Sequence, residues 1–444
     1  MKSKKRNWLK LSLQGGTLLA IVAFILYGIF FGEQRADPEA YCPFGGLQAI
    51  GSYLHNNSLA CSMSMAQIMM GVVLAVGVIL FSKLFCGYLC PLGTIGEYLG
   101  KGGRKLKMNF DLKPGGITDR GLRIVKYGLL FVVFYMSVSS SELFCKNFDP
   151  YYAMATGFKG EITAWMTSIS IVLLFLGSFF IKMFWCKYIC PLGALSNIFK
   201  FTITFVGILL LFWLLGWAGL PSAWVWALGA ACLIGYLYEM IYLRSKVFPL
   251  LRIVRDAESC NGCGSCTKKC PYHIDLKELK TVRHIDCTLC GDCVSSCPKG
   301  SLQVGGKKSL RWLPGILTIV LFVLALILGN QWELPTIDER WGNTEQVGEM
   351  KTFEMEGLTS IKCYGSSKAF SAKMQKVPGV YGVKTFVKRH AVVISYDPAQ
   401  TNEDKIREVI FIPTIMKFSN PEPQVDSVEV LTLGVDKLFD RMDM

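Results

Sequence analysis

Eight cysteines between residues 260 and 297 form two runs with the same internal spacing. The first run is Cys260-x2-Cys263-x2-Cys266-x3-Cys270-Pro271, and the second is Cys287-x2-Cys290-x2-Cys293-x3-Cys297-Pro298. A tight loop of this kind wraps three thiolates around one [4Fe–4S] cubane, and the fourth cysteine of each run ligates the other cluster. The spacing therefore predicts two clusters, one held by Cys260, Cys263, Cys266 and Cys297, the other by Cys270, Cys287, Cys290 and Cys293.

Zinc is the main alternative for cysteines in pairs, but zinc sites need four-ligand groups with longer internal spacers. Gly262, Gly264 and Gly291 allow the backbone to turn close to a cluster. His273 and His284 lie between the two runs, and we expect them to be exposed polar residues because all eight ligand positions are already filled. The segment is thus typical of a bacterial-type two-cluster ferredoxin.

A second cysteine pattern occurs twice, at an offset of 100 residues. Cys86-x3-Cys90-Pro91-Leu-Gly93 recurs as Cys186-x3-Cys190-Pro191-Leu-Gly193. Cysteines at i and i+4 share one helix face, so two such faces brought together present four thiolates. Four thiolates are the ligand count of a further [4Fe–4S] cluster. The alternative is that the four thiols are buried and pack as small apolar side chains.

The elements that must position these cysteines are membrane helices. The chain is 52% hydrophobic and only 18% charged, whereas a soluble protein carries roughly a quarter charged residues. Apolar blocks of about 20 residues are long enough to cross a hydrocarbon core of roughly 30 Å. We identify seven, at 11–32, 65–85, 122–140, 162–184, 201–219, 222–243 and 312–330.

Lys and Arg residues predict how these helices are oriented. The segments 1–10, 82–126, 182–200 and 244–311 hold 30 of them, against 3 in segments 33–64 and 142–161. The positive-inside rule then places the N-terminus and both cysteine patterns on the cytoplasmic side, and seven crossings place the C-terminus outside. The net charge of +14 is explained by this topology, so nucleic acid is not indicated as a partner.

Three cysteines fall in the predicted outer loops, where the compartment is oxidising. Cys42, Cys61 and Cys145 are candidates for a structural disulfide. The alternatives are a redox-active pair or a metal site involving Cys42 and Cys145. Cys232 stands alone in an apolar helix and is expected to pack there.

Residues 351–412 have a strand–helix–strand–strand–helix pattern. Pro378-Gly379-Val380 and Tyr396-Asp397-Pro398 match the framework of the heavy-metal-associated domain of copper chaperones, which this region resembles. That family binds Cu(I) with two cysteines, but here Cys363 is kept and Ser366 replaces the second. One thiolate does not make a two-coordinate Cu(I) site. Two interpretations therefore stay open. Either Cys363 takes part in copper binding, or the region is a docking module that has lost its metal site.

The two Cys-x3-Cys-Pro-Leu-Gly motifs followed by a double ferredoxin resemble the membrane polyferredoxin family that includes NapH, NosR, YccM and CcoG. The resemblance covers roughly residues 10–330 and implies membrane electron transfer with [4Fe–4S] centres. The expected fold is a polytopic α-helical membrane protein with an internal repeat of helix pairs, an inserted 2[4Fe–4S] ferredoxin domain and a C-terminal ferredoxin-like βαββαβ domain. The expected divisions are 1–243 (transmembrane domain), 244–310 (cytoplasmic ferredoxin domain), 311–330 (last transmembrane helix), 331–350 (linker), 351–420 (heavy-metal-associated-like domain) and 421–444 (tail).

Our leading hypothesis is an electron-transfer protein of the cytoplasmic membrane. A cytoplasmic donor protein reduces the clusters, and a quinone or another acceptor in the membrane or at its outer face is the partner downstream. One alternative is a copper reductase or metal-handling factor for oxidase assembly, as in CcoG. The other is a non-catalytic subunit that wires a larger redox complex.

Overall fold

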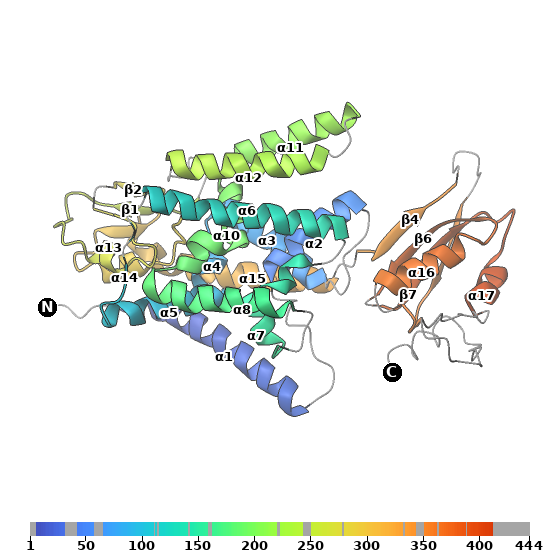
Figure 1. The fold of residues 1–444 in the computed structure, drawn as a ribbon, viewed down its shortest axis with the longest axis horizontal. Coiled ribbons are helices and arrows are strands. Elements are labelled where there is room, and N and C mark those ends of the chain that lie inside the picture. The colour runs from blue at the N-terminus through green and yellow to red at the C-terminus, as the bar shows by residue number, and fades with distance from the viewer. Residues whose placement is uncertain are drawn as a thin grey trace. The chain divides into compact units, whose positions relative to one another are not determined.

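The computed structural model describes most of the chain between residues 6 and 411. The segments outside the description are 1–5, 32–41, 57–64, 111, 113–114, 141–142, 159–161, 220–222, 243–249, 278, 332–333, 343–349, 362–363, 388 and 412–444. The chain divides into two compact units, which are drawn in Figure 1. The first unit comprises Met1–Gly46, Met69–Met136 and Phe144–Leu328, and the second comprises Leu47–Ile68, Ser137–Leu143 and Gly329–Met444.

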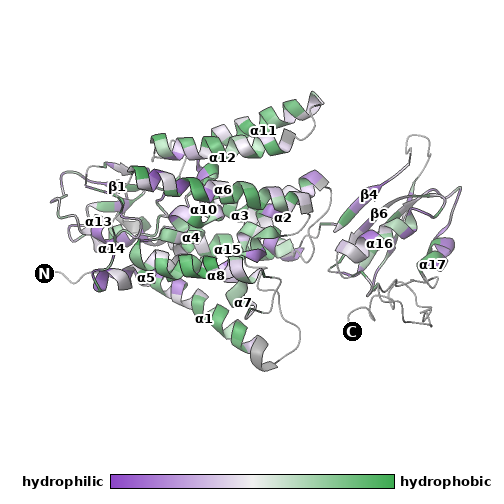
Figure 2. Cartoon of the chain, viewed as in Figure 1, coloured by the Kyte–Doolittle hydropathy of each residue, from purple (hydrophilic) through white to green (hydrophobic). Residues whose placement is uncertain are grey.

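Four helices within the described residues are long and apolar enough to cross a membrane. Hydrophobic residues also cover much of the shorter helices α8 (Ala164–Val172) and α11 (Thr202–Trp217) (Figure 2). Many of the large apolar side chains on the candidate membrane helices face outward. Leu19, for example, is 71% exposed. The four candidate spans lie in α1 (Trp8–Phe31), α6 (Ile117–Ser140), α12 (Ala223–Tyr242) and α15 (Leu313–Gln331).

A fifth span is possible where α10 (Pro191–Lys200) and α11 (Thr202–Trp217) meet at an angle of 95°. The predicted spans 65–85 and 162–184 correspond to shorter apolar helices, Met65–Leu80 (α3) and Ala164–Phe180. Each is short because the chain leaves helical geometry just before a Cys-x3-Cys-Pro motif. The total of seven spans therefore remains a prediction.

The remaining elements of the helical part are short. They are α2 (Pro43–Asn56), α4 (Leu84–Tyr88), α5 (Pro91–Lys105), the 3-10 turn η2 (Phe144–Asn147), α7 (Pro150–Ala155), α8 (Ala164–Val172), the π-helical turn η3 (Leu173–Gly177), α9 (Ser178–Phe180), the π-helical turn η4 (Trp185–Ile189) and the 3-10 turn η5 (Lys308–Trp312).

The two Cys-x3-Cys-Pro segments have closely similar backbones. Cys90 is the residue before α5 and Cys190 is the residue before α10, with φ/ψ of −64°/119° and −63°/114°. Extended geometry is what a following proline imposes, and the proline then begins the next helix. In both segments a Cβ built on the glycine three residues later would lie 2.8 Å from a cysteine carbonyl oxygen, Cys86 for Gly93 and Cys186 for Gly193.

The cysteine-rich segment 252–304 folds around a small antiparallel sheet in the first unit. Its order is β2 (Thr281–Val282), β1 (Ile253–Arg255), β3 (Leu302–Val304). The short helices α13 (Ser265–Lys269) and α14 (Asp292–Ser296) each follow a glycine with positive φ, Gly264 at 65° and Gly291 at 75°. The core of this segment is continuous with residues beside the membrane motifs, because Leu84, Tyr88 and Met183 belong to the same buried cluster.

The second unit contains a four-stranded antiparallel sheet with the order β4-β6-β7-β5. Its core includes Phe353, Phe370, Ile394 and Ile406. The sheet and the two helices α16 and α17 follow the expected strand–helix–strand–strand–helix pattern, while the last strand of a βαββαβ domain falls outside the described residues. The elements are β4 (Ile337–Arg340), β5 (Lys351–Met355), α16 (Tyr364–Met374), β6 (Val380–Phe386), β7 (Ala391–Tyr396) and α17 (Glu403–Phe411).

The segment 331–350, expected to be a polar linker, contains strand β4. Ile337 pairs with Thr385 and Arg340 with Gly382 at the edge of the sheet. The strand was missed because only Ile337 is both apolar and buried, and a single apolar residue gives no alternating pattern.

Replacing Gly93 or Gly193 by alanine is expected to destabilise the protein. The added methyl group would press on the carbonyl oxygen of Cys86 or Cys186, and overpacking of this kind costs about 1–3 kcal/mol. Thermal unfolding of the detergent-purified protein measures the effect. The control is Gly128→Ala in α6, where no atom lies within 4 Å of the added Cβ. If both motif variants unfolded at the same temperature as the wild-type protein, the close contact between each glycine and the cysteine carbonyl would be contradicted.

Candidate functional site

The eight cysteines of segment 260–297 line two separate cavities. Cys260, Cys263, Cys266 and Cys297 surround one, and Cys270, Cys287, Cys290 and Cys293 surround the other. These are the two groups expected from the spacing. Four thiols converging from two loops on one cavity is the donor set that a [4Fe–4S] cubane requires. We call the first group the distal site and the second group the proximal site.

The two sites differ in their access to solvent. Cys263 of the distal site is exposed, and the pKa of Cys260 is lowered by the backbone N–H of Gly262 and by Arg255. At the proximal site Cys293 is buried, and burial raises the pKa of Cys270 to about 11. A bound cationic centre favours the thiolate form even in such an apolar setting. The distal site is therefore the one that a soluble protein can reach.

The four cysteines of the repeated motif line a single cavity of about 550 Å³ in the first unit. The Cys90 sulfur is close enough to those of Cys86, Cys186 and Cys190 for electrostatic interaction. The structure thus brings together four thiols that lie up to about 100 residues apart in the sequence. The wall between them is largely apolar and includes Phe85, Leu92, Trp185 and Leu192.

Two of the cysteines that the sequence places in predicted outer loops also line this cavity. Cys42 and Cys145 line it together with Asp149. Asp149 also begins helix α7, because its carboxylate accepts a hydrogen bond from the Tyr151 backbone N–H at 3.0 Å. Burial raises the pKa of Asp149 to about 6. The predictions for Cys61 and Cys363 lie outside the described residues, and within the described residues no three His, Cys, Asp or Glu side chains are grouped as ligands of a single metal ion.

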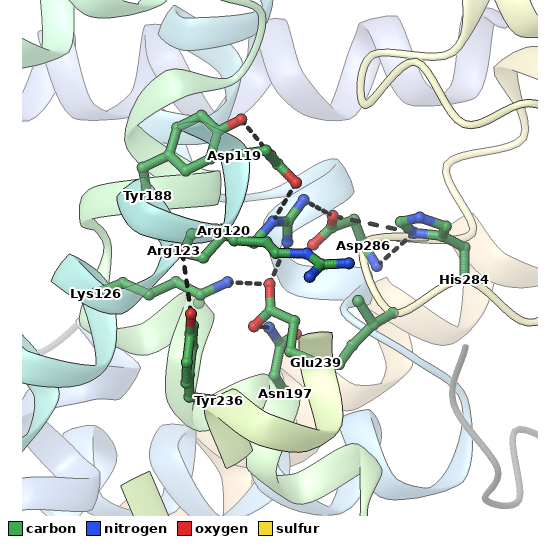
Figure 3. A network of polar contacts seen from close by, with 12 residues as sticks. Asp119, Arg120, Arg123, Lys126, Tyr188, Asn197, Tyr236, Glu239, His284 and Asp286 are labelled. Atoms are coloured by element: carbon green, nitrogen blue, oxygen red, sulfur yellow. Dashed lines mark hydrogen bonds and ion pairs between the residues drawn. The ribbon is translucent and has the colours of Figure 1, made fainter. Parts of the chain in front are cut away.

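A buried cluster of charges fastens the proximal site to the membrane helices (Figure 3). Arg123 on α6 donates hydrogen bonds to Asp119 at 3.1 Å, to Asp286 at 2.9 Å and to Glu239 on α12. Lys126 also donates to Glu239, at 2.7 Å. Although burial opposes its charged form, Asp286 has a pKa held well below the usual range by Arg123. Since Asp286 directly precedes Cys287, this network fixes the loop that begins the proximal site.

Residues from other elements also bind the proximal loop, residues 285–292. Lys10 on α1 donates to Asp292 at 2.6 Å and to Glu97 on α5 at 2.8 Å. Burial favours the neutral carboxyl, but Lys10 and Lys101 outweigh it and lower the pKa of Glu97 to about 2. Further hydrogen bonds reach backbone carbonyls of the loop, from Asn7 to Cys290 (2.7 Å), from Ser82 to Cys287 (2.6 Å) and from Lys200 to Ile285 (2.6 Å).

Sequence reasoning missed most of these anchors. Arg123 and Lys126 were counted as membrane-flanking cations, yet both are fully buried in the network. Glu239 gave the clearest signal that was available, because an acidic residue inside an apolar helix is costly unless it is paired. His284, expected to be exposed, is partly buried and lies 4.0 Å from Asp286.

The substitution Arg123→Gln is expected to unfold the protein at a lower temperature and to loosen the proximal site. It leaves Asp119 and Asp286 buried without the Arg123 cation and Glu239 with Lys126 alone, and breaking a buried ion pair from one side costs about 3–5 kcal/mol. Thermal unfolding and the EPR signal of the proximal cluster measure the two effects. Arg120→Gln is the matched control, because Arg120 is exposed on the same helix. Equal behaviour of the two variants would refute the anchoring role.

Two protein-family models match the two cysteine-rich regions of the chain. A model described as "4Fe-4S binding domain" matches residues 63–109 and 163–203, which contain the two Cys-x3-Cys-Pro motifs. A model described as "4Fe-4S dicluster domain" matches residues 252–298, which contain the distal and proximal sites. The dicluster match supports [4Fe–4S] clusters as cofactors of segment 252–298.

Several curated proteins are similar to parts of the chain. "Putative electron transport protein YccM" of Escherichia coli is 29% identical over 257 residues, covering 56% of this chain and 58% of that protein. "Regulatory protein NosR" of Stutzerimonas stutzeri is 34% identical over 127 residues, covering 28% of this chain and 17% of that protein. "Ferredoxin-type protein NapH" of Haemophilus influenzae is 31% identical over 119 residues, covering 26% of this chain and 38% of that protein.

The matched region spans less than two thirds of each of these relatives. No solved structure matches the chain. The two family models fall on the segments whose cysteines converge. Among the relatives, the name of YccM refers to electron transport and that of NapH to a ferredoxin type. The chain is therefore similar to YccM, NosR and NapH over part of its length, and its two cysteine-rich regions match models of 4Fe-4S binding domains.

Proposed function

We propose that this protein passes electrons from a soluble donor to an acceptor in the membrane or at its outer face. The observation that carries the proposal is the convergence of Cys86, Cys90, Cys186 and Cys190 on one cavity. Four thiols in an apolar membrane cavity match the donor set of a third [4Fe–4S] cluster. Together with the distal and proximal sites, they would form a series of centres within one compact unit.

In this proposal the clusters and the groups of residues around them have different roles. The clusters, when bound, supply reversible one-electron transfer. The cysteines hold them, and the buried charge networks keep the proximal loop at a fixed position relative to the membrane helices. The apolar wall of the cavity excludes water, which protects a reduced centre from side reactions.

The distal site is proposed as the entry point for the donor. It is the more exposed of the two, and Lys268, Lys269 and Lys277 lie exposed beside it. Positive charge around a redox centre steers an acidic partner protein toward it. A donor with an acidic surface, such as a small soluble redox protein, fits this chemistry.

The orientation in the membrane is part of the same proposal. The excess of Lys and Arg in segments that include the ferredoxin region supports a cytoplasmic location for the distal and proximal sites. Cys42, Cys145 and Asp149 then lie toward the outer side of the cavity, and the C-terminal domain 351–420 lies outside the cytoplasm. An acceptor at that side, protein or quinone, completes the transfer.

The iron content of anaerobically purified protein tests the third cluster. We expect about 12 iron atoms per chain, falling to about 8 when Cys86 and Cys186 are both replaced by serine, because one cubane holds four irons. Iron assay and EPR after chemical reduction measure both states. Cys232→Ser in α12 is the control, since Cys232 is buried away from the cavity lining.

A count of about 8 in the wild-type protein, unchanged in the double variant, would refute the third cluster. A loss of iron from the distal or proximal site in the double variant would show instead that the motif cysteines support folding. The EPR spectrum separates these outcomes because the distal and proximal signals remain in one case and disappear in the other.

A further inference from the structure

One aromatic side chain separates the proximal site from the thiol-lined membrane cavity. Tyr272 lines both cavities, and among the residues that the structure describes it is the one that does so. It follows Cys270, a proximal-site cysteine, by two residues, and its side chain is 8% exposed. The ring is thus part of the wall of each site.

The hydroxyl of Tyr272 also contacts the membrane motif directly. Its oxygen lies within hydrogen-bonding reach of the sulfur of Cys186. The hydroxyl is also near enough to Cys86 and Cys90 to interact with them electrostatically. Tyr272 is therefore connected by its backbone to one predicted ligand set and by its side chain to the other.

The surroundings of Tyr272 are closely packed. The ring packs in the same buried cluster as Leu84, Tyr88 and Leu289. On the neighbouring helix α4, a Cβ built on Gly87 would lie 3.1 Å from the Thr288 side chain, which is beside proximal-site Cys287. Helix α4 carries Cys86, so this close packing brings the motif against the proximal loop.

We propose that Tyr272 is the positioning residue that links the proximal centre to the membrane centre. Its ring fills the space between them, and its hydroxyl tunes the membrane centre through the sulfur of Cys186. This inference rests on the proposed third cluster. Hydrogen bonds to the ligand sulfurs are among the factors that set the potential of an iron–sulfur centre.

The direction of the effect follows from charge. A donated hydrogen bond stabilises the more negative, reduced form of the centre. Tyr272→Phe removes the hydroxyl and keeps the ring, so the membrane centre becomes harder to reduce while the protein stays folded. Tyr272→Leu removes both, so electron exchange between the two centres also becomes slower.

EPR-monitored redox titration of the full-length protein tests the inference. For Tyr272→Phe we expect unchanged iron content, a lower midpoint potential for the membrane centre, and an unchanged potential for the distal centre. Freeze-quench EPR of Tyr272→Leu is expected to show a severalfold slower arrival of electrons at the membrane centre. Tyr98→Phe is the control, because Tyr98 is exposed on α5.

The outcomes separate this inference from the proposal on which it rests. A wild-type protein without a third EPR signal would refute the third cluster itself. A wild-type protein with three signals, but a Tyr272→Phe variant whose membrane centre keeps its potential, would refute the role of Tyr272 alone. An equal shift of all three centres would show a general loosening of the fold and would also refute the specific link.

Discussion

The ion pairs of Arg123 hold this architecture together. Arg123 joins α6, α12 and the loop that begins the proximal site, through Asp119, Glu239 and Asp286. A guanidinium buried with three carboxylates is costly to assemble and more costly to break, so its partners are confined to one arrangement. Because electron transfer depends on fixed distances, a loop that carries cluster ligands must not move relative to the membrane helices. Lys10, with Glu97 and Asp292, performs the same task from the other side.

The second constraint is the helix break at each Cys-x3-Cys-Pro motif. Proline cannot continue the preceding helix but suits the first position of the next one. Each break leaves the second cysteine between two helices, and the glycine three residues later allows the chain to pack against the first cysteine's carbonyl. A separate interruption of the helix, at residues 81–83 and 181–183, ends α3 and the helix Ala164–Phe180 before each motif, so both apolar helices are shorter than a membrane span.

Local patterns in the sequence were sufficient to predict which cysteines share a cavity, but not which residues surround and anchor those cavities. The spacing of the cysteines predicted which four line the distal cavity and which four line the proximal one, since each group depends on short loops. The offset of 100 residues predicted that Cys86, Cys90, Cys186 and Cys190 converge. Asp119 lies four residues before Arg123 on the same helix, so this pair has a local pattern. The partners Glu239 and Asp286 could not be predicted in this way, because they come from two other elements. Tyr272 gave no signal in the sequence, since one tyrosine beside a cysteine ligand is consistent with simple packing.

The central claim is that a membrane centre lies next to the proximal cluster, and magnetic coupling tests it most directly. Power-saturation EPR of the fully reduced protein detects spins that relax faster because another paramagnetic centre is nearby. We predict that the proximal signal relaxes faster in the wild-type protein than in the Cys86→Ser/Cys186→Ser variant, while Cys232→Ser matches the wild type. Identical saturation of the proximal signal in all three proteins would contradict the account.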